Sequence, residues 1–585
     1  MKKELVNKII KLVSLIIGLF NVLMFHSLRC CWSGISKTLG YEKADTLVEA
    51  EFILNLPIIV FVLILLAFIA NIVLYKVMKK EKNLWSYIML GVNLIFLIAI
   101  IVIIALGAID YMYFVIQEFA KVLAISALVF FSIFMIFIYP KTKFADNKVF
   151  KYSIFGTILL CAIIVVLNYS INTISYKPVV YAVEDEYQIV FGTSSEALGW
   201  VEINGKKYTD TSAGSEKSYT KVHKISVPME DLENATEYTI YTQRFHYRGP
   251  FGAIKDTVIS ETYSYRGIDF SGGIDYYAIS DIHMETNGSV KAANYNSKKD
   301  FLVLIGDVIS FIETEDDAFY TNKVAHEMTK GSIPVVYARG NHEVKGRYSE
   351  EFYKYVGSKN QNFYYSFYFK DSDESIYGLV LDMGEDHDDD WWEYYETAHY
   401  DEYREEQALF LESELAKDSS DKYSYQNYKY RMLVTHIPVN YINSRKNHVP
   451  IKEKLTGLLN QFNLDISLSG HQHDIWIFEP GVVEPMEKMP YNSNYSSSNH
   501  KGMVTDYNFP AFLVSKRGLT QTDSDELTQT TQIGLSVHVN ETHQVLAFNN
   551  SNGEVLNMVN SFADITYGKE ITITRDTKTF SRLTD

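Results

Sequence analysis

The sequence predicts a multi-domain chain, in which an all-α transmembrane bundle is followed by a small β-sandwich and then by an α/β domain. Its 585 residues are too many for one domain. Long apolar runs are almost confined to residues 1–175. Short strand patterns with turn signals follow them. From residue 272 the chain contains apolar, β-branched-rich runs of the kind found in buried parallel strands.

Charge divides the chain at the same place. Residues 1–175 carry 16 Lys and Arg against 9 Asp and Glu, a net charge of +7. Subtracting these from the totals of 54 and 71 leaves 38 basic and 62 acidic residues in the remainder, a net charge of −24. We therefore expect no nucleic acid as a specific partner, because phosphate contacts need Lys and Arg. The three cysteines, Cys30, Cys31 and Cys161, leave no disulfide or thiolate metal site after residue 161.

Five apolar segments in residues 1–175 have the length of a membrane-spanning helix. They are residues 9–28, 52–76, 86–109, 121–139 and 152–172. No small-residue cleavage site follows the first segment, so we interpret it as a retained helix rather than a signal peptide. The prediction is a five-helix transmembrane anchor over residues 1–175, with the lipid bilayer as its partner.

The distribution of Lys and Arg predicts the orientation of this anchor. Twelve lysines lie in the N-terminus and in the loops after the second and fourth spans, against four basic residues in the alternate loops. This asymmetry predicts a multi-pass protein of the cell membrane with a cytoplasmic N-terminus and an extracellular C-terminal part. Asn71 and Asn93 are better explained as interhelical hydrogen-bonding groups than as a substrate path. A transporter with an appended domain stays the alternative to an anchor.

Residues 176–267 show short strand patterns separated by turns. Strands are expected at residues 187–191, 199–203, 222–227 and 239–242, with Asn204-Gly205 as a hairpin turn. Leu232, six residues before the strand-start Tyr238, resembles the corner of a fibronectin type III-like sandwich. Two interpretations remain open: a spacer, which we favour, and a module that binds a ligand or partner.

Polar side chains follow each of five apolar strand patterns after residue 272. These strands are expected at residues 274–280, 301–305, 333–338, 431–435 and 464–469. The residues that follow them in turn are Asp281 and His283, then Asp307, then Asn341, His342 and Glu343, then His436, and finally His471 and His473. In open α/β sheets ligands bind outside the carboxyl ends of the strands, so these side chains are expected at one edge.

Seven of these side chains suit two metal ions. Imidazole and carboxylate ligands without thiolate favour Mn, Fe or Zn. Asp281 and His283 are two residues apart, so both can point to one face of an extended chain. Asp307 is the natural carboxylate to bridge two ions. Such a pair activates a water and stabilises the attacking and leaving oxygens of an in-line displacement.

The five motifs, in this order, resemble those of the calcineurin-like metallophosphoesterase superfamily over residues 272–515. The resemblance implies a four-layer α/β/β/α sandwich. It implies that one metal is held by Asp281, His283, Asp307 and His473, and the other by Asp307, Asn341, His436 and His471. It also implies that His342 is the catalytic histidine beside the leaving group, with Glu343 as its orienting partner. The alternative for His342 is structural support of its loop.

The order of sandwich and catalytic domain also resembles that of the purple acid phosphatases, with two departures. Those enzymes carry a tyrosine three residues after the bridging aspartate, where this chain has Ser310. Their first motif lacks the histidine that stands here as His283. A tyrosine-ligated ferric ion is therefore not expected, and metallophosphoesterases without that tyrosine are the expected relatives.

These features together predict a membrane-anchored, outward-facing phosphoester hydrolase with two divalent transition metal ions. In this mechanism a metal-bridging hydroxide attacks phosphorus in line, and protonated His342 donates a proton to the leaving alkoxide. The alternative is a non-catalytic surface module that uses the same fold for binding, and the complete set of metal ligands argues against it. The choice between monoester and diester, and the oligomeric state, stay open.

The predicted catalytic domain covers residues 272–560, with closing strands at 511–516, 534–539 and 544–549, and a polar tail follows at 561–585. An acidic, aromatic insertion at residues 382–406 interrupts the path between two core strands. Its Trp391, Trp392, Tyr394 and Tyr395 suit an aromatic leaving group, a lid or a membrane face. We expect its acidic residues to form a solvated face, and residues 407–417 to form a helix that packs on the core.

Overall fold

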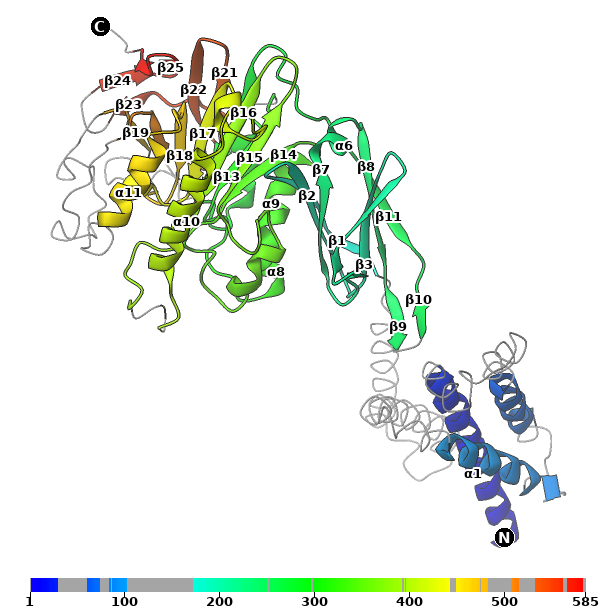
Figure 1. The fold of residues 1–585 in the computed structure, drawn as a ribbon. Coiled ribbons are helices and arrows are strands. Elements are labelled where there is room, and N and C mark those ends of the chain that lie inside the picture. Colours follow the sequence, from blue (N-terminus) through cyan, green and yellow to red (C-terminus); the bar gives the residue numbers. More distant parts are fainter. Residues whose placement is uncertain are drawn as a thin grey trace. The chain divides into compact units, whose positions relative to one another are not determined.

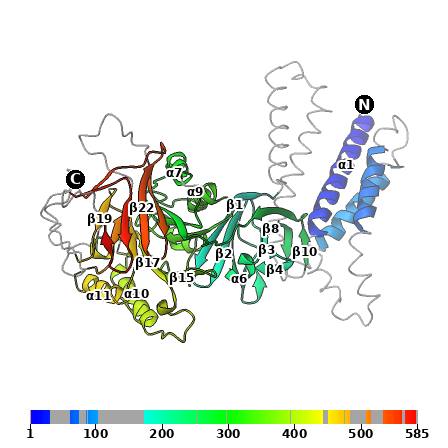
Figure 2. The same cartoon turned by 90° about the horizontal axis from the view of Figure 1, so that it is seen from above.

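The chain forms two compact units in the computed structural model, shown in Figures 1 and 2. The first contains Met1–Ile171 and Phe245–Thr257, and the second contains Asn172–Arg244 and Val258–Asp585. The structure describes residues 2–29, 60–73, 84–85, 87–102, 172–249, 252–295, 298–391, 394, 396–441, 449–473, 475–481, 507–514, 532–560 and 565–581.

The first unit contains α1 (Lys2–Arg29), helical residues 60–73 and 87–102, and the hairpin of β9 (Phe245–Gly249) and β10 (Gly252–Lys255). Buried polar side chains connect its helices. Ser14 Oγ donates a hydrogen bond to Asn71 Oδ1 at 2.8 Å, and Asn93 Nδ2 donates to Ser14 Oγ at 3.0 Å. Asn71 and Asn93 therefore form interhelical hydrogen bonds, as the sequence predicted.

The predicted five-helix transmembrane bundle is wrong. In the described part of the chain, no helix combines the length and the apolar character needed to cross a bilayer. The predicted multi-pass location in a cell membrane, with a cytoplasmic N-terminus and an extracellular catalytic domain, is overturned by the same finding. The segment at 121–139 and parts of those at 52–76, 86–109 and 152–172 lie outside the described residues.

The second unit is built on two large sheets. The ten-stranded sheet has the order β26 (Thr579–Phe580), β25 (Ile571–Thr574), β22 (His543–Asn550), β21 (Ile533–Val539), β12 (Ile274–Ile279), β13 (Phe301–Ile305), β14 (Pro334–Ala338), β1 (Ile174–Val183), β2 (Glu186–Thr193) and β7 (Val222–Pro228). The six-stranded sheet has the order β15 (Tyr365–Lys370), β16 (Ser375–Leu381), β17 (Tyr430–Thr435), β18 (Ile466–Ser469), β20 (Ala511–Leu513) and β19 (Trp476–Phe478). Strands β12, β13 and β14 pair in parallel, as do β16, β17 and β18, so the carboxyl ends of each set lie along one edge of its sheet.

Three apolar cores order these sheets into four layers, because alternate strand residues point to opposite faces. Ala278, Val303, Val434 and Leu468 belong to the core between the two sheets. The other face of the ten-stranded sheet packs against α7 (Thr286–Ala293) and α9 (Tyr320–Thr329), which follows the short α8 (Glu315–Ala318). The other face of the six-stranded sheet packs against α10 (Tyr400–Leu415) and α11 (Val449–Leu459), as Figure 1 shows. The C-terminal part is thus an α/β sandwich, and the helix predicted at 407–417 lies within and just after α10.

The predicted small sandwich shares a sheet with this core. Its outer sheet contains β11 (Ile259–Ser264), β8 (Glu237–Gln243), β3 (Leu198–Ile203) and β4 (Lys206–Thr209), with α6 (Met229–Glu233) and the small hairpin of β5 (Thr211–Ser212) and β6 (Ser215–Glu216) between strands. Its other sheet is the β1, β2 and β7 end of the ten-stranded sheet, where Val180 of β1 lies opposite Pro334 of β14. The limits predicted at residues 267 and 272 therefore do not separate two independent sheets.

The C-terminal residues also depart from the prediction. The region expected as a polar tail at 561–585 contains β24 (Ile565–Gly568), which pairs with β23 (Met558–Asn560), and also β25 and β26. Ile571 and Ile573 of β25 are buried and alternate with threonines. A four-residue alternation inside a polar stretch is too short to stand out in the sequence. The remaining short helices are 3-10 turns at Ser349–Lys354, Tyr425–Asn427 and Val439–Tyr441.

His223 is a buried imidazole on β7, packed against residues of β2 and β3. It is 1% exposed and packs on Phe191 with 5.0 Å between ring centroids. A Cβ at position 199 would lie 2.4 Å from its ring, which accounts for the glycine there. Its Nδ1 has no hydrogen-bond partner among the described residues. Burial and the charge of Lys217 lower the pKa of His223 to about 3.

We expect acid to destabilise this part of the second unit through His223. In the unfolded chain the pKa of histidine is about 6.5, so protonation favours unfolding below that pH, and the loss grows until the folded pKa is reached. The local free energy of unfolding should fall by about 2 kcal/mol between pH 8 and pH 5. Hydrogen exchange of peptides covering β2 and β7, corrected for intrinsic rates, measures this change. The variant His223→Gln should lose this part of the pH dependence and keep the part due to Lys224 of β7, whose pKa burial lowers to about 7. His543→Gln should behave as wild type, and a wild-type profile in His223→Gln would contradict the assignment.

Candidate metal centre

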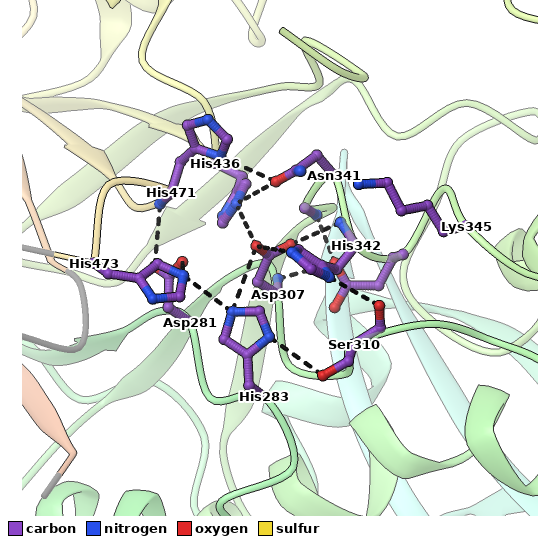
Figure 3. Close-up of polar contacts among 12 residues, drawn as sticks. Asp281, His283, Asp307, Ser310, Asn341, His342, Lys345, His436, His471 and His473 are labelled. Carbon is purple, nitrogen blue, oxygen red and sulfur yellow. Dashed lines mark hydrogen bonds and ion pairs between the residues drawn. The ribbon is translucent and has the colours of Figure 1, made fainter. Parts of the chain in front are cut away.

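The predicted site residues lie at the carboxyl ends of five strands. Figure 3 shows the contacts among the side chains of most of them. Asp281 and His283 follow β12, Asp307 follows β13, Asn341, His342 and Glu343 follow β14, His436 follows β17, and His471 and His473 follow β18. The first three strands belong to the ten-stranded sheet and the last two to the six-stranded sheet. The parallel pairing inside each sheet brings these strand ends to a common edge.

The backbone of these loops is held in an unusual conformation. Positive φ values occur at Asp281 (52°), His283 (43°), Asp307 (51°), His471 (77°) and His473 (53°). Residues with a Cβ adopt this region at a cost, and such strain clusters at functional sites. The turn after β14 adds a close approach, because a Cβ at Gly340 would lie 2.1 Å from Asp307 Oδ1.

One group of ligand atoms is formed by Asp281, His283, Asp307 and His473, whose ligand atoms all lie within 4.8 Å of one another. His473 Nε2 is 3.3 Å from Asp281 Oδ1 and 3.1 Å from His283 Nε2. His283 Nε2 is 3.8 Å from Asp307 Oδ2. The side chain of His473 is 43% exposed, so this group faces solvent on one side.

A second group shares Asp307 and is more deeply buried. It contains Asp307, His436 and His471, again with ligand atoms within 4.8 Å. His436 Nε2 lies 3.1 Å from Asp307 Oδ2, while its Nδ1 faces the carbonyl oxygen of Ile305 at 2.6 Å. Asn341 Oδ1 lies 3.2 Å from His436 Nε2 and 3.0 Å from His471 Nδ1. The amide oxygen of Asn341 therefore completes a four-residue donor set.

The pKa values of the two aspartates and of His283 suit metal binding, and that of His436 does not. Burial opposes charge on both aspartates, yet the neighbouring histidines lower the pKa of Asp281 below its usual range and that of Asp307 to about 2. Burial lowers the pKa of His283 to about 4. Burial alone would lower the pKa of His436, but the charge of Asp307 raises it to about 10. Metal ligands must be deprotonated, so binding at His436 releases a proton.

Glu343 makes different contacts from those predicted. Instead of orienting His342, its buried carboxylate accepts hydrogen bonds from the backbone N–H groups of Asp307 at 2.9 Å, Val308 at 2.7 Å and Gly340 at 2.8 Å. Burial and the nearby Asp307 raise its pKa to about 7. Glu343 therefore ties the loop after β13 to the loop after β14.

His342 is oriented by a backbone carbonyl. Its Nδ1 lies 2.8 Å from the carbonyl oxygen of Ser310, so the proton on Nδ1 is donated there and Nε2 is left facing the site. Nε2 lies 3.9 Å from Asp307 Oδ2, and the His342 side chain is 33% exposed. The Ser310 hydroxyl, which stands where the purple acid phosphatases have tyrosine, lies 3.4 Å from His283 Nδ1.

Two site residues were missed from the sequence. Glu385 and Asp386, from the acidic insertion, contact the second group: Asn341 Nδ2 donates to Glu385 Oε1 at 3.4 Å, and His471 Nε2 lies 3.4 Å from Asp386 Oδ2. Glu385 is only 2% exposed, so the prediction of a solvated acidic face is wrong for it. The signal was available, since both residues follow β16, a sixth strand that ends at this edge. Trp392, Glu393 and Tyr395 of the insertion lie outside the described residues.

Comparison with known proteins gives one family match. Residues 275–474 match the family model for calcineurin-like phosphoesterases. No curated protein matches the chain. The purple acid phosphatase PPD1 from yellow lupin (Lupinus luteus) seeds is similar at 14% identity and a TM-score of 0.42, over 71% of this chain and 79% of that one. GAP50, the anchor in the inner membrane complex of Plasmodium, is similar at 15% identity and a TM-score of 0.32, over 48% of this chain and 86% of that one.

The family match covers the strands whose ends carry the two candidate ligand groups. All the predicted ligand positions, from Asp281 to His473, fall inside residues 275–474. The strand order, the donor set and the matched range agree with one another. The chain therefore contains a calcineurin-like phosphoesterase domain with acidic and histidine residues that can form its metal site.

Proposed function

We propose that the chain is a metal-dependent phosphoester hydrolase that acts on phosphomonoesters or phosphodiesters with two divalent ions of Mn, Fe or Zn. One observation carries the proposal. Asp307 belongs to both candidate ligand groups, so a single carboxylate is placed to be shared by two ions. Oxygen and nitrogen donors without thiolate are the ligands that these metals accept.

We assign four ligands to each ion from the two groups of donor atoms. Asp281, His283, Asp307 and His473 would hold one, and Asp307, Asn341, His436 and His471 would hold the other. When bound, such a pair of ions supplies Lewis-acid stabilisation of phosphate oxygens and an activated water. The same donors argue against a structural zinc site, because structural zinc is usually held by four ligands that include cysteine.

The chain's own residues supply the proton chemistry. The Nδ1 proton of His342 is engaged by the Ser310 carbonyl, so Nε2 is the atom that can give a proton to the leaving oxygen. Glu343 acts indirectly, because it fixes the loops that carry Asp307 and His342. Asp307 Oδ1 adds to this by accepting the backbone N–H of His342 at 2.9 Å.

We expect the purified chain to hydrolyse p-nitrophenyl phosphate or bis(p-nitrophenyl) phosphate when loaded with Mn²⁺. Chelation should abolish turnover, and renewed Mn²⁺ should restore it. Release of p-nitrophenol gives the rate, and elemental analysis after dialysis gives the number of ions. Fewer than one ion per chain together with no turnover of either ester would refute the proposal. Two bound ions without turnover would instead favour the non-catalytic binding module.

A further inference from the structure

Two adjacent carboxylates, Glu385 and Asp386, lie directly behind the second ligand group. They belong to the loop after β16, and neither is in the predicted ligand set. Glu385 contacts Asn341, and Asp386 contacts His471. Asn341 and His471 are ligands of that group whose metal-binding atom depends on how the side chain is turned or protonated.

The amide of Asn341 can bind a metal only through its oxygen. In the structure Oδ1 faces His436 and His471, while Nδ2 donates to Glu385 Oε1. A carboxylate accepts hydrogen bonds and donates none, so a reversed amide would place two oxygens against each other. Lys345 Nζ, 2.7 Å from the same Oε1, balances the charge of this buried carboxylate.

The imidazole of His471 can bind a metal through either ring nitrogen, and its tautomer decides which one is free. Its Nδ1 faces Asn341 Oδ1, and its Nε2 faces Asp386 Oδ2. Asp386 is kept in place by His387, whose Nδ1 lies 2.7 Å from Asp386 Oδ1. A carboxylate oxygen accepts hydrogen bonds, so this contact assigns the His471 proton to Nε2 and leaves the Nδ1 lone pair for a metal.

Glu385, Asp386 and His387 could themselves be read as a third metal group, since their ligand atoms lie within 4.8 Å. Their oxygens are already engaged by side chains. Lys345 and Asn341 contact Glu385 Oε1, and His387 and His471 each contact one oxygen of Asp386. These carboxylates therefore contact the candidate metal ligands and do not themselves serve as a third metal site.

We propose that Glu385 and Asp386 are positioning residues for the second metal site. Glu385 sets the amide orientation of Asn341, and Asp386 sets the tautomer of His471. The inference rests on the proposed function, because it requires a metal at Asp307, Asn341, His436 and His471. Removing either carboxylate should weaken the second ion about 10- to 100-fold and leave the first ion unchanged.

The test titrates the full, metal-depleted chain with Mn²⁺ in four forms: wild type, Glu385→Gln, Asp386→Asn and Asp390→Asn. Asp390 is an exposed aspartate of the same loop and serves as the matched control. Equilibrium dialysis counts the bound ions. Electron paramagnetic resonance separates a single Mn²⁺ from a coupled pair. Thermal unfolding without metal checks that each variant is folded.

Wild type and Asp390→Asn are expected to bind two ions and to show the coupled signal. Glu385→Gln and Asp386→Asn should bind one ion at the Mn²⁺ concentration that saturates wild type, and excess Mn²⁺ should restore the pair. Wild-type affinity for both ions in the variants, or equal weakening of both, would overturn the inference. Two ions in wild type without ester hydrolysis would refute the proposed function and leave the inference standing; no bound ion in wild type would refute both.

Discussion

Replacing Asp307 with asparagine is expected to abolish binding of both metal ions and to lower kcat/KM for phosphoester hydrolysis by at least about a thousandfold. That loss corresponds to about 4 kcal/mol of transition-state stabilisation. Asp307 is the only residue common to the two candidate ligand groups found in the described part of the chain. A neutral amide in its place removes the negative charge that both ions would share.

The substitution keeps the shape of the loop. The new asparagine side chain retains an oxygen that can accept the backbone N–H of His342, and the anchoring of the loop by Glu343 uses the backbone N–H of residue 307. The loss should therefore come from the missing charge. Elemental analysis, Mn²⁺ titration and hydrolysis rates measured on the same preparations test this.

Asp300 offers a matched control at the other end of β13. It is 4% exposed and accepts a hydrogen bond from the backbone N–H of Asp275. Burial raises its pKa to about 6, so it resembles Asp307 in being a buried aspartate beside the same strand. Asp300→Asn should keep both ions and the wild-type rate. Retention of two ions by Asp307→Asn would contradict the shared-ligand assignment.

The sequence could bring the candidate ligands together because each follows a short apolar strand pattern. In a parallel sheet the position after such a strand fixes both the edge and the direction of the side chain. This reasoning placed Asp281, Asp307 and His436 without any knowledge of distances. The same reasoning was not applied to Glu385 and Asp386, because the chain runs on from the end of β16 at Leu381 before it reaches Glu385, inside a longer acidic stretch.

The hydrogen-bond partners of Glu343 could not be predicted from the sequence for a different reason. A sequence shows that a carboxylate is near a histidine, but it does not show which backbone N–H groups lack partners. Those of Asp307, Val308 and Gly340 converge on Glu343 only after two strands pair. The continuity of the sandwich with the central sheet was hidden in the same way, since it depends on β1 pairing with β14, which lies far along the chain.

The apolar runs of residues 1–175 show the limit of composition as evidence. Their length and hydropathy in the sequence match a membrane span, yet no helix in the described part of the chain has both the length and the apolar character to cross a bilayer. Ser14, Asn71 and Asn93 form hydrogen bonds with one another, so these polar side chains connect the helices. A count of apolar residues contains no information about such hydrogen bonds between helices.

Replacing His342 with alanine is expected to lower the hydrolysis rate by about 10²- to 10⁴-fold while both metal ions remain bound. His342 belongs to neither ligand group, and its Nε2 lies 3.9 Å from Asp307 Oδ2. The Ser310 carbonyl holds the Nδ1 proton, so the missing function is proton donation from Nε2.

A leaving-group comparison separates this role from a structural one. An alkyl phosphate has a basic leaving oxygen that needs a proton, whereas p-nitrophenolate leaves readily without one. His342→Ala should therefore lose far more activity on the alkyl ester than on p-nitrophenyl phosphate, with two ions per chain in both assays. His543→Ala, on β22, should match wild type on both substrates. Equal losses on the two esters, or loss of metal in step with loss of rate, would show that His342 supports its loop and donates no proton.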